Sequence, residues 1–478
     1  MLFVLLFNLS LLVFRLLYIL YYPLDLTPEE AQYWDWSRHL DLSYYSKPPM
    51  VAYLNFLSTK LLGNTELAVR IWPVMFSFLL SILTYRFIRK LYDEKTAIVA
   101  STLPQLSVGL SINSILMTTD APFIFFWSLS VIILYFAFEK NTTFLWLLVG
   151  LTSGLTFLSK YTAVFLLPCS LLYAYFVKKH ILRDSRPYLA LAVAFMLSSP
   201  VLYWNYIHGF VSFKHVSTLA TKGSGLFNVE NILEFLGGQA LLTSLIPFFF
   251  MLWGWLKAYK DQKLFFFFSY SFPVFVFFML LAVKKRVEAN WTGFAYFAGF
   301  ILASYFIARN TRWILPSYVL SSVLFVLIHF TPILDKLGLT RLLPPENDPV
   351  KVGIGWKALG LEVSKMYTGR ELVFSPQYQI SAELAFYVKG NPRTYCINLG
   401  RRMNQYDLWR KGMEEYIGKD AIFVDMAPVD GRVLKAFEGI IEERTLPVVW
   451  RGKVVKTFYI YKLRNYRGGI EEAIPAGY

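Results

Sequence analysis

The stretch Asp25–Lys60 decides how the rest of the chain is interpreted, and its sequence is DLTPEEAQYWDWSRHLDLSYYSKPPMVAYLNFLSTK. It follows an apolar run, is too polar to cross a bilayer, and is rich in aromatic residues. Thr27 and Glu30 have the spacing of a capping box, and Pro28 stands at the first helical position. The stretch therefore predicts a helix that begins at Pro28 and does not span a membrane.

One face of this helix is expected to be apolar, because Tyr33, Trp36 and Leu40 recur at helical spacing opposite the charges. Such a helix is typical of the membrane interface. After the break at residues 44–49, a second amphipathic helix is expected. Its apolar stripe consists of Met50, Leu54, Leu57 and Leu61. Together the two helices predict an aromatic platform at the water–lipid boundary that carries carboxylates and a lysine.

The composition predicts an α-helical membrane protein with several spans. Of 478 residues, 56% are hydrophobic and 18% aromatic, which exceeds the apolar content of ordinary soluble proteins. The net charge of +15 is interpreted as basic loops against anionic lipid headgroups, not as a nucleic-acid surface. The two cysteines, Cys169 and Cys396, predict neither a disulfide framework nor a metal cluster.

About eleven apolar segments have roughly the length of a membrane span. They cover residues 2–22, 67–85, 97–116, 121–138, 143–159, 161–177, 187–204, 233–256, 264–283, 291–308 and 313–330. The first lacks a cleavage pattern and is expected to be a membrane helix, in which Arg15 faces protein or snorkels. Only Lys160 and Tyr161 separate the fifth segment from the sixth, so one long helix with a buried lysine is the alternative there.

The loop charges predict an orientation with the N-terminus inside the cell. Positive charge then lies in every inner loop, as the positive-inside rule requires. These loops are residues 86–90, 139–140, 178–180, 257–263 and 309–312. Glu29 and the C-terminal part of the chain would lie outside.

The composition changes near residue 342, after a proline-rich linker. We expect a transmembrane domain at 1–341, with 25–63 as its first periplasmic loop, and a soluble α/β periplasmic domain at 342–478. Strands are expected at 371–374, 393–398, 421–424, 447–450 and 454–462, and helices at 380–388 and 431–441.

Ionisable side chains from separate loops meet on the outer face of this topology. They are Glu29, Glu30, Lys47, Asp120, Lys160, His208, His215, Lys284, Lys285, Arg286 and Glu288. Ionisable groups at membrane depth are costly and mark functional sites. Most of them also have a structural alternative: capping for Glu30, a helix N-cap for Asp120, a snorkelling end for Lys160, headgroup anchoring for residues 284–286, and structural hydrogen bonding for the histidines.

A carboxylate opposed by several cations suits one chemistry in particular. The carboxylate can deprotonate an acceptor hydroxyl while the cations stabilise a phosphate leaving group. A lipid-linked phosphosugar would enter such a site from the bilayer.

Several blocks of the chain resemble the GT-C glycosyltransferases of the ArnT (lipid A aminoarabinose transferase) and protein mannosyltransferase family. The first two are LTPEEAQYW at 26–34 and YYSKPP at 44–49. The others are MTTDAP at 117–122, LSKY at 158–161, Trp204-Asn205 with His208, VEANW at 287–291, and YQISAELAFY at 378–387. The blocks run in order through nearly the whole chain.

The resemblance implies an inverting transfer of one sugar from an undecaprenyl-phosphate donor, without a nucleotide sugar, on the periplasmic face of the bacterial inner membrane. The acceptor would be of lipid A or lipopolysaccharide type, or another cell-envelope glycan. The catalytic carboxylates would be Glu29, as general base, and Asp120. The donor phosphate would be held by Lys47, Lys160, Lys284, Lys285 and Arg286. Acceptor or structural support would come from Glu30, Tyr45, Tyr161, His208 and Asn290.

Two departures from the resembled family concern the first loop. Glu29 stands where the family usually has Asp, and Ser46 stands where aminoarabinose transferases have a Glu that helps to bind a metal. No cofactor is therefore firmly expected, although a divalent metal is possible.

The alternative functions are a transporter or flippase for lipid-linked sugars, and a protein O-mannosyltransferase or ligase of the GT-C type. The absence of repeated halves and the grouping of cations on one face count against the transporter.

Overall fold

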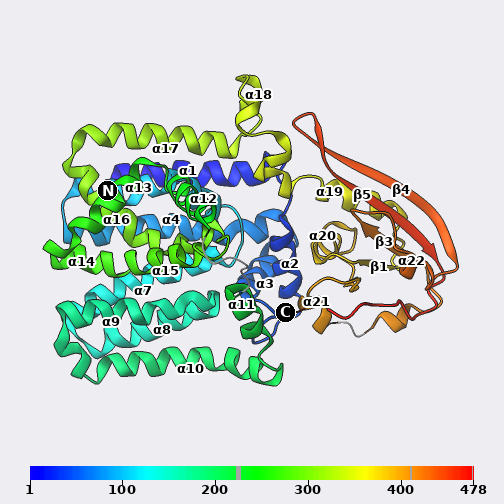
Figure 1. Ribbon diagram of the computed structural model, residues 1–478, viewed down its shortest axis with the longest axis horizontal. Helices are drawn as coiled ribbons and strands as arrows, with labels where there is room; N and C mark the ends of the chain where they lie inside the picture. The colour runs from blue at the N-terminus through cyan, green and yellow to red at the C-terminus, as the bar shows by residue number, and fades with distance from the viewer. Residues whose placement is uncertain (222–227, 410–411, 476, 478) are drawn as a thin grey trace.

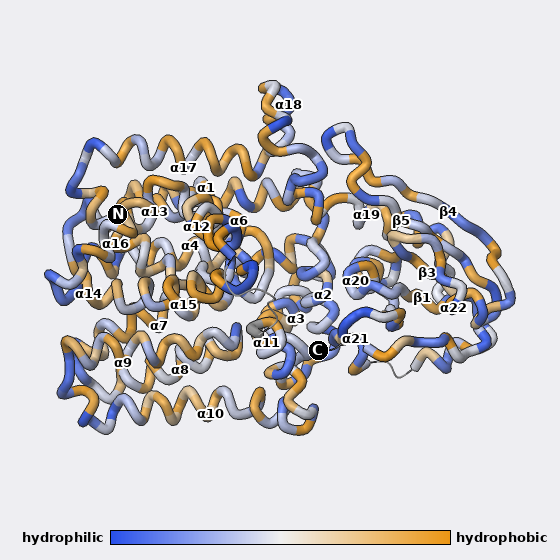
Figure 2. The backbone as a smooth tube through the Cα atoms, viewed as in Figure 1, coloured by the Kyte–Doolittle hydropathy of each residue, from blue (hydrophilic) through white to orange (hydrophobic). Residues whose placement is uncertain are grey.

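The protein consists of a long helical bundle with a smaller sheet domain at one end, as seen in a computed structural model (Figure 1). The structure describes residues 1–221, 228–409, 412–475 and 477. The N-terminus lies at the end of the bundle far from the sheet domain (Figure 1). The bundle helices are mostly apolar along their lengths, whereas hydrophilic residues gather at their ends and over the sheet domain (Figure 2).

The main bundle helices lie side by side (Figure 1). They are α1 Leu2–Tyr21, α4 Glu66–Leu91, α7 Asp120–Lys140, α8 Thr143–Ser159, α9 Leu166–Val177, α10 Arg186–Ile207, α14 Gln262–Ser269, α15 Phe272–Ala282, α16 Tyr296–Arg309 and α17 Ile314–His329. Within the described residues, seven helical segments are long and apolar enough to cross a membrane, or eight if one bent pair is a single span. A membrane protein with several spans is confirmed, and the number eleven stays a prediction.

Several of the expected spans are not single α-helices. Residues 97–116 form α5 Glu94–Thr102, a 3-10 turn at Leu103–Leu106 that contains Pro104, and α6 Val108–Asn113. Residues 233–256 fall in α12 Val229–Leu242 and α13 Ile246–Lys257, which are bent by 107°. Ser244 and Leu245 between them have φ of 66° and 57°, which a continuing right-handed helix does not permit.

The alternative of one long helix around Lys160 is wrong. Lys160 has extended backbone angles, with φ −160° and ψ 138°, and directly follows the end of α8. A 3-10 turn at Tyr161–Phe165 then leads into α9. The break leaves the lysine side chain at the end of the bundle.

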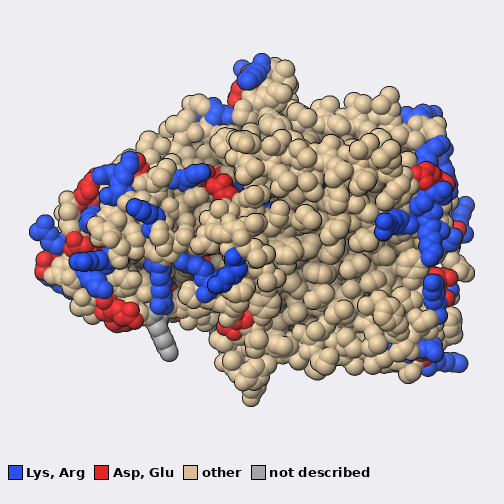
Figure 3. Space-filling model, turned by 180° about the vertical axis from the view of Figure 1, so that it is seen from behind, with Lys and Arg blue, Asp and Glu red and all other residues tan. Residues whose placement is uncertain are grey.

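The loops predicted to be inner do lie together at the end far from the sheet domain. Lys178 pairs with Glu139 at 3.0 Å, and the ammonium group of Lys263 donates to the carbonyl oxygen of Leu91 at 3.3 Å. Figure 3 shows a band of basic side chains at this end. The structure thus gathers these loops on one face, whereas the side of the membrane stays a prediction.

The sheet domain contains five strands in the order β2-β1-β3-β5-β4. They are β1 Leu372–Ser375, β2 Thr394–Cys396, β3 Ala421–Asp425, β4 Gly439–Trp450 and β5 Lys453–Arg464. β1 is parallel to β2 and β3, whereas β5 is antiparallel to β3 and β4. The helix expected at 431–441 is wrong: α22 covers only Gly431–Leu434, and β4 begins at Gly439 because it pairs with β5 along its length.

Helix α2, Pro28–Ser37, has the predicted capping box, in which the backbone N–H of Thr27 donates to Glu30 Oε2 at 2.9 Å. The expected exposure of one face to lipid is wrong, because every residue of α2 except Glu29 is buried, whereas the level of the helix relative to the membrane stays a prediction. The helix α20, Tyr378–Tyr387, packs against it from the sheet domain and covers the face expected to meet lipid and water. Leu40 lies beyond the helix and is exposed.

The second loop helix, α3 Met50–Leu62, is half buried along its predicted stripe. Met50 and Leu54 are buried, whereas Leu57 and Leu61 are exposed.

Glu383 lies in α20, at the junction between the sheet domain and α2. It is 1% exposed, and neither carboxylate oxygen has a hydrogen-bond partner among the described residues. Burial raises the pKa of Glu383 well above its usual range, and the nearby charge of Asp25 adds to this. The carboxyl group is therefore neutral when the two parts are packed together.

We predict that Glu383→Gln raises the thermal unfolding temperature of the protein near pH 8 and leaves it unchanged near the pKa of a free glutamate. The pKa of Glu383 is raised in the folded state, so the folded protein binds more protons than the unfolded chain. Wild-type stability must then fall as pH rises from the unfolded pKa toward the folded one, and the neutral amide removes this loss. Glu471→Gln, at an exposed carboxylate, is the control. An equal shift at both pH values would contradict the assignment.

Candidate active site

Polar side chains from five segments meet at the end of the bundle that faces the sheet domain. We call them the charged cluster: Glu29 at the start of α2, Lys47 in the loop before α3, Asp120 at the start of α7, Lys160 after α8, and Asn290 in the 3-10 helix Ala289–Ala295. All five had been expected at the site from the sequence, although Asn290 only in a supporting role.

Asp120 accepts hydrogen bonds from two other members of the charged cluster, one at each carboxylate oxygen. Lys160 Nζ donates to Asp120 Oδ1 at 2.6 Å, and Asn290 Nδ2 donates to Asp120 Oδ2 at 2.7 Å. The side chains of Asp120 and Lys160 are 13% and 12% exposed. The N-cap alternative for Asp120 is wrong, since Thr119 occupies the N-cap of α7. Charge-assisted bonds to both oxygens make Asp120 a fixed, ionised group.

Lys47 lies in a turn closed by the backbone N–H of Tyr44, which donates to the carbonyl oxygen of Lys47 at 3.1 Å. Burial and, next, the neighbouring charge of Lys160 lower the pKa of Lys47 to about 8, against the opposing effects of Asp120 and Glu29. Lys47 therefore lies within electrostatic reach of the other three charged members and changes charge close to neutral pH.

Glu29 is the member of the cluster whose carboxylate remains open. Its side chain reaches solvent, and no side chain among the described residues donates a hydrogen bond to it. Protein around the carboxylate nevertheless raises the pKa of Glu29, as does the charge of Glu30, against the lowering effects of its backbone N–H and Lys47. The sequence predicts that the helix N-terminus stabilises the ionised form, and the backbone N–H of Glu29 does act in this direction, although the surrounding protein outweighs it. A raised pKa and free lone pairs suit a general base near neutral pH.

Two tyrosines border the cluster, and neither was expected at the site from the sequence. The hydroxyl of Tyr33 in α2 hydrogen-bonds with Thr119, and burial together with the charges of Glu29 and Asp120 raises its pKa. Tyr378 at the start of α20 also interacts electrostatically with Glu29. The sheet domain thus reaches the site, and the only sequence signal for this was the family-like block at 378–387.

Glu30 has a structural role. Its carboxylate pairs with Arg70 of α4 at 2.7 Å, and both side chains are completely buried. It also accepts a hydrogen bond from the backbone N–H of Met117 at 2.9 Å, in the segment that leads to Asp120. Arg70 was missed, although a charged residue within an apolar span is the signal that could have found it.

The remaining support residues shape the loops around the cluster. The Tyr161 hydroxyl hydrogen-bonds with Ser43 Oγ at 3.1 Å. Tyr45 is buried against Trp204. The His208 ring stacks on Trp204 at 3.9 Å between centroids, and its Nδ1 lies 2.8 Å from that residue's carbonyl oxygen.

The basic run Lys284-Lys285-Arg286 precedes Asn290 in the same loop. Arg286 pairs with Glu234 at 2.7 Å, and its side chain is 69% exposed. The Lys285 ammonium donates to the carbonyl oxygen of Leu219 and lies 5.0 Å from the centre of the Trp291 ring. Within the described residues, no recorded contact joins this run to the charged cluster.

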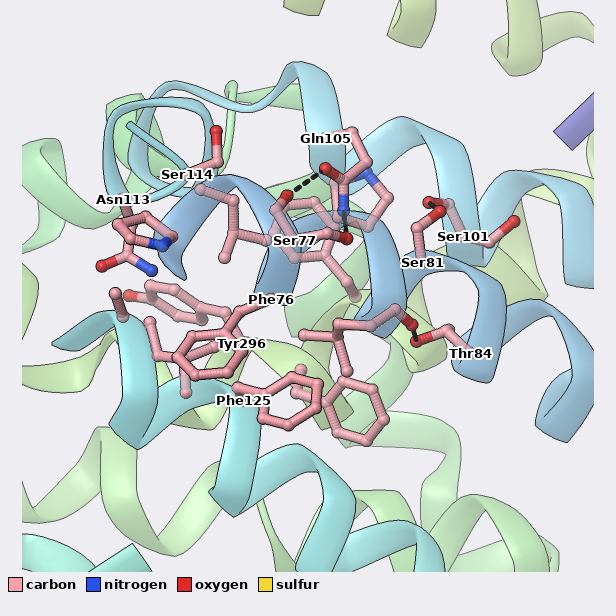
Figure 4. A pocket seen from close by; sticks show the side chains of 18 of the residues that line it. Phe76, Ser77, Ser81, Thr84, Ser101, Gln105, Asn113, Ser114, Phe125 and Tyr296 are labelled. Atoms are coloured by element: carbon pink, nitrogen blue, oxygen red, sulfur yellow. Dashed lines mark hydrogen bonds between the residues drawn. The ribbon is translucent and has the colours of Figure 1, made fainter. Parts of the chain in front are cut away.

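A small cavity inside the bundle lies next to the cluster, since Ala121 at its wall follows Asp120. Figure 4 shows its lining, where Ser77 Oγ donates to Gln105 Oε1 at 2.6 Å. Gln105 also accepts from buried Arg15, which faces protein as expected. None of the lining residues is charged, so this cavity offers space beside the cluster but no ionic chemistry of its own.

A larger apolar cavity of about 360 Å³ lies among α8, α9 and α10. Phe157 and Ala163 in its lining flank Lys160 in the sequence. An apolar space beside the lysine is suited to a lipid chain whose charged head lies at Lys160.

In the described part of the chain, the side chains that could bind a metal ion do not come together. No group of three or more His, Cys, Asp or Glu side chains there could hold a metal ion. Ser46 adds no carboxylate at the position where the resembled transferases have one. The described residues therefore do not assemble such a three-ligand centre, and no step is assigned to a metal.

A sequence profile of the dolichyl-phosphate-mannose-protein mannosyltransferase family matches residues 46–204. The chain is 27% identical to the lipid A galacturonosyltransferase RgtD of Rhizobium johnstonii over 380 residues, which cover 76% of this chain and 78% of RgtD. It is 31% identical to the undecaprenyl phosphate-alpha-4-amino-4-deoxy-L-arabinose arabinosyl transferase of Pseudomonas aeruginosa over 166 residues, or 33% of this chain and 30% of that relative. The match to the arabinosyl transferase thus spans about a third of either protein.

The fold is that of ArnT from Cupriavidus metallidurans. The crystal structure of that protein bound to undecaprenyl phosphate superposes with a TM-score of 0.68 at 13% identity, over 96% of this chain and 98% of that one. The apo structure gives a TM-score of 0.66. The matched profile and the curated relatives are glycosyltransferases, and the fold is that of ArnT, so the chain is similar to ArnT-like GT-C membrane glycosyltransferases in both sequence and fold.

Proposed function

We propose that the protein transfers a single sugar from an undecaprenyl-phosphate-linked donor to a lipid A-type acceptor, with inversion, at the charged cluster. The observation that carries the proposal is the contrast between the open carboxylate of Glu29 and the bonded carboxylate of Asp120. The donor and acceptor classes rest on the relatives, a lipid A galacturonosyltransferase and undecaprenyl phosphate-dependent arabinosyl transferases.

The reaction is a displacement at the anomeric carbon of the donor sugar. Glu29 takes the proton of the acceptor hydroxyl as its oxygen forms a bond to that carbon. The bond from the carbon to the phosphate oxygen breaks at the same time, and undecaprenyl phosphate leaves with the electron pair. Attack opposite to the leaving group inverts the configuration.

Lys47 and Lys160 hold the donor phosphate and stabilise the charge that develops on it. The apolar cavity among α8, α9 and α10 receives part of the polyprenyl chain, because its lining flanks Lys160. Asp120, fixed by Lys160 and Asn290, orients the lysine and the acceptor and does not itself take the proton.

Purified protein incubated with lipid A and a panel of undecaprenyl-phosphate sugars, including galacturonic acid and aminoarabinose, tests the overall assignment. Modified lipid A in mass spectra with one donor supports it. Turnover of no donor, with folded protein, would refute it.

We predict that Glu29→Gln lowers turnover at least ~100-fold, the usual scale for loss of a general base. Donor affinity and thermal stability should change little, because Glu29 makes no recorded side-chain hydrogen bond that the amide would lose. The measurements are initial rates, donor binding and unfolding temperature on the same preparations.

Glu30→Gln, at the adjacent carboxylate, shows whether a substitution here acts through stability instead of catalysis. It leaves Arg70 buried without its partner, so we expect a stability loss of about 3–5 kcal/mol. Glu230→Gln, at an exposed carboxylate of α12, should change neither activity nor stability. If Glu29→Gln keeps the wild-type turnover, Glu29 is not the general base, and the role passes to Asp120.

A separate prediction concerns Lys47. Since its pKa is lowered to about 8, Lys47 loses its charge as pH rises through this value, and donor affinity should fall with it. A phosphodiester keeps its charge throughout this range, so the donor does not contribute to the change. Lys47→Arg should retain affinity above pH 8, because a guanidinium stays protonated. Titration of an undecaprenyl-phosphate sugar, which is such a phosphodiester, across this pH range checks the prediction.

Arg286→Gln in the same binding assay decides the role of residues 284–286. We propose that this run also contributes to phosphate binding, and the substitution should then weaken affinity without loss of folded yield. Unchanged affinity would leave the run as a headgroup anchor paired to Glu234.

We also propose that the charged cluster and the sheet domain lie on the periplasmic side of the inner membrane. The support is the basic band at the opposite end of the bundle, which the positive-inside rule places in the cytoplasm (Figure 3).

We predict that alkaline phosphatase fused after Tyr478 is active, and that a fusion after Lys263 is inactive, because the enzyme matures only outside the cytoplasm. Immunoblots must show equal expression of the two fusions. The reverse pattern of activities would place the site on the cytoplasmic face.

A further inference from the structure

The segment 333–342 projects sideways from the bundle at its junction with the sheet domain (Figure 1, α18). It consists of α18 Ile333–Lys336 and a 3-10 turn at Thr340–Leu342, joined through Gly338. The segment directly follows the end of α17 at His329. It therefore leaves the bundle at the end that carries the charged cluster.

The projection exposes leucines between basic residues. Leu337, Leu339 and Leu342 are 60%, 41% and 75% exposed. Lys336 and Arg341 are also exposed, and neither forms an ion pair among the described residues. Exposed apolar groups flanked by unpaired cations are typical of segments that bind anionic lipid surfaces.

The side from which the segment projects faces lipid. α17 is long and apolar enough to span the membrane, with only 17% of its span buried. Its exposed residues Leu315, Val319, Val323 and Val326 follow one helix face. A projection from the outer end of such a helix lies at the level of the lipid headgroups.

The segment is held firmly and is not a frayed linker. Leu334 is buried, and Thr340 Oγ1 donates to Asp335 Oδ1 at 2.7 Å. Arg451, in the turn between β4 and β5, donates through Nε and Nη2 to the two oxygens of Asp335, both at 2.7 Å. Asp335 is therefore neutralised by Arg451, which leaves the projection with a net positive surface.

We propose that residues 333–342 are an interfacial anchor that inserts Leu337, Leu339 and Leu342 into the anionic phospholipid surface around the protein. Lys336 and Arg341 bind the phosphate groups of the same lipids. The Arg451–Asp335 pair ties the anchor to the β4–β5 hairpin, so the anchor sets the position of the sheet domain relative to the membrane surface. The anchor does not depend on which sugar or acceptor the enzyme uses.

The test uses a nitroxide label on Leu339→Cys in the full chain, reconstituted in nanodiscs of phosphatidylcholine and phosphatidylglycerol. Both native cysteines are buried, so labelling is confined to the new site. Leu361→Cys on α19, Trp356–Met366, is the matched control because Leu361 is 59% exposed in the sheet domain. Leu342→Cys serves as a second position in the anchor.

We expect the label at 339 to be accessible to oxygen and shielded from a water-soluble nickel chelate, with the opposite pattern at 361. Lys336→Gln with Arg341→Gln should reduce this difference in nanodiscs that contain phosphatidylglycerol and not in pure phosphatidylcholine. Equal nickel access at 339, 342 and 361 would overturn the proposal. So would spin–spin broadening at 339 that disappears on dilution with unlabelled protein, since it would assign the leucines to a second copy of the chain.

Discussion

The buried ion pair between Glu30 and Arg70 is the interaction on which the site depends. Arg70 also donates to the carbonyl oxygens of Leu24 and Asp25, each at 2.8 Å, and so fixes the start of the first loop. Glu30 accepts from the backbone of Met117, three residues before Asp120. One fully desolvated pair therefore sets the relative positions of both candidate carboxylates. Loss of either partner would leave the other as an unpaired charge in the protein interior.

The sheet domain packs directly against the helix that carries Glu29. α20 packs over α2, and the hydroxyl of Tyr387 donates to Glu66 Oε1 at 2.7 Å while accepting from the backbone of Leu26. The same helix carries Tyr378 toward Glu29 and buries the neutral Glu383. Because one helix carries all three residues, the docking of the domain and the electrostatics of the site are coupled.

The electrostatic roles within the cluster follow from contacts and not from residue type. Asp120 and Glu29 are both carboxylates, but Asp120 has two donors at short distance whereas Glu29 has no side-chain donor among the described residues. Two carboxylates in different environments are thereby suited to different tasks, orientation for one and proton transfer for the other. Lys47, whose pKa is lowered by burial, interacts electrostatically with both carboxylates.

The sequence by itself determined much of the local structure and the five members of the charged cluster. The capping box at Thr27 and Glu30, most of the apolar helices, the first strands of the sheet and the outer ionisable residues were predicted because each depends on neighbouring residues or on hydropathy. Only the tertiary structure decided that α2 is buried, that Arg70 pairs with Glu30, and that protein around its carboxylate raises the pKa of Glu29. It also decided that residues 439–446 form a strand, because β5 pairs with them. Burial and pairing depend on which distant surfaces meet, and no local pattern records that.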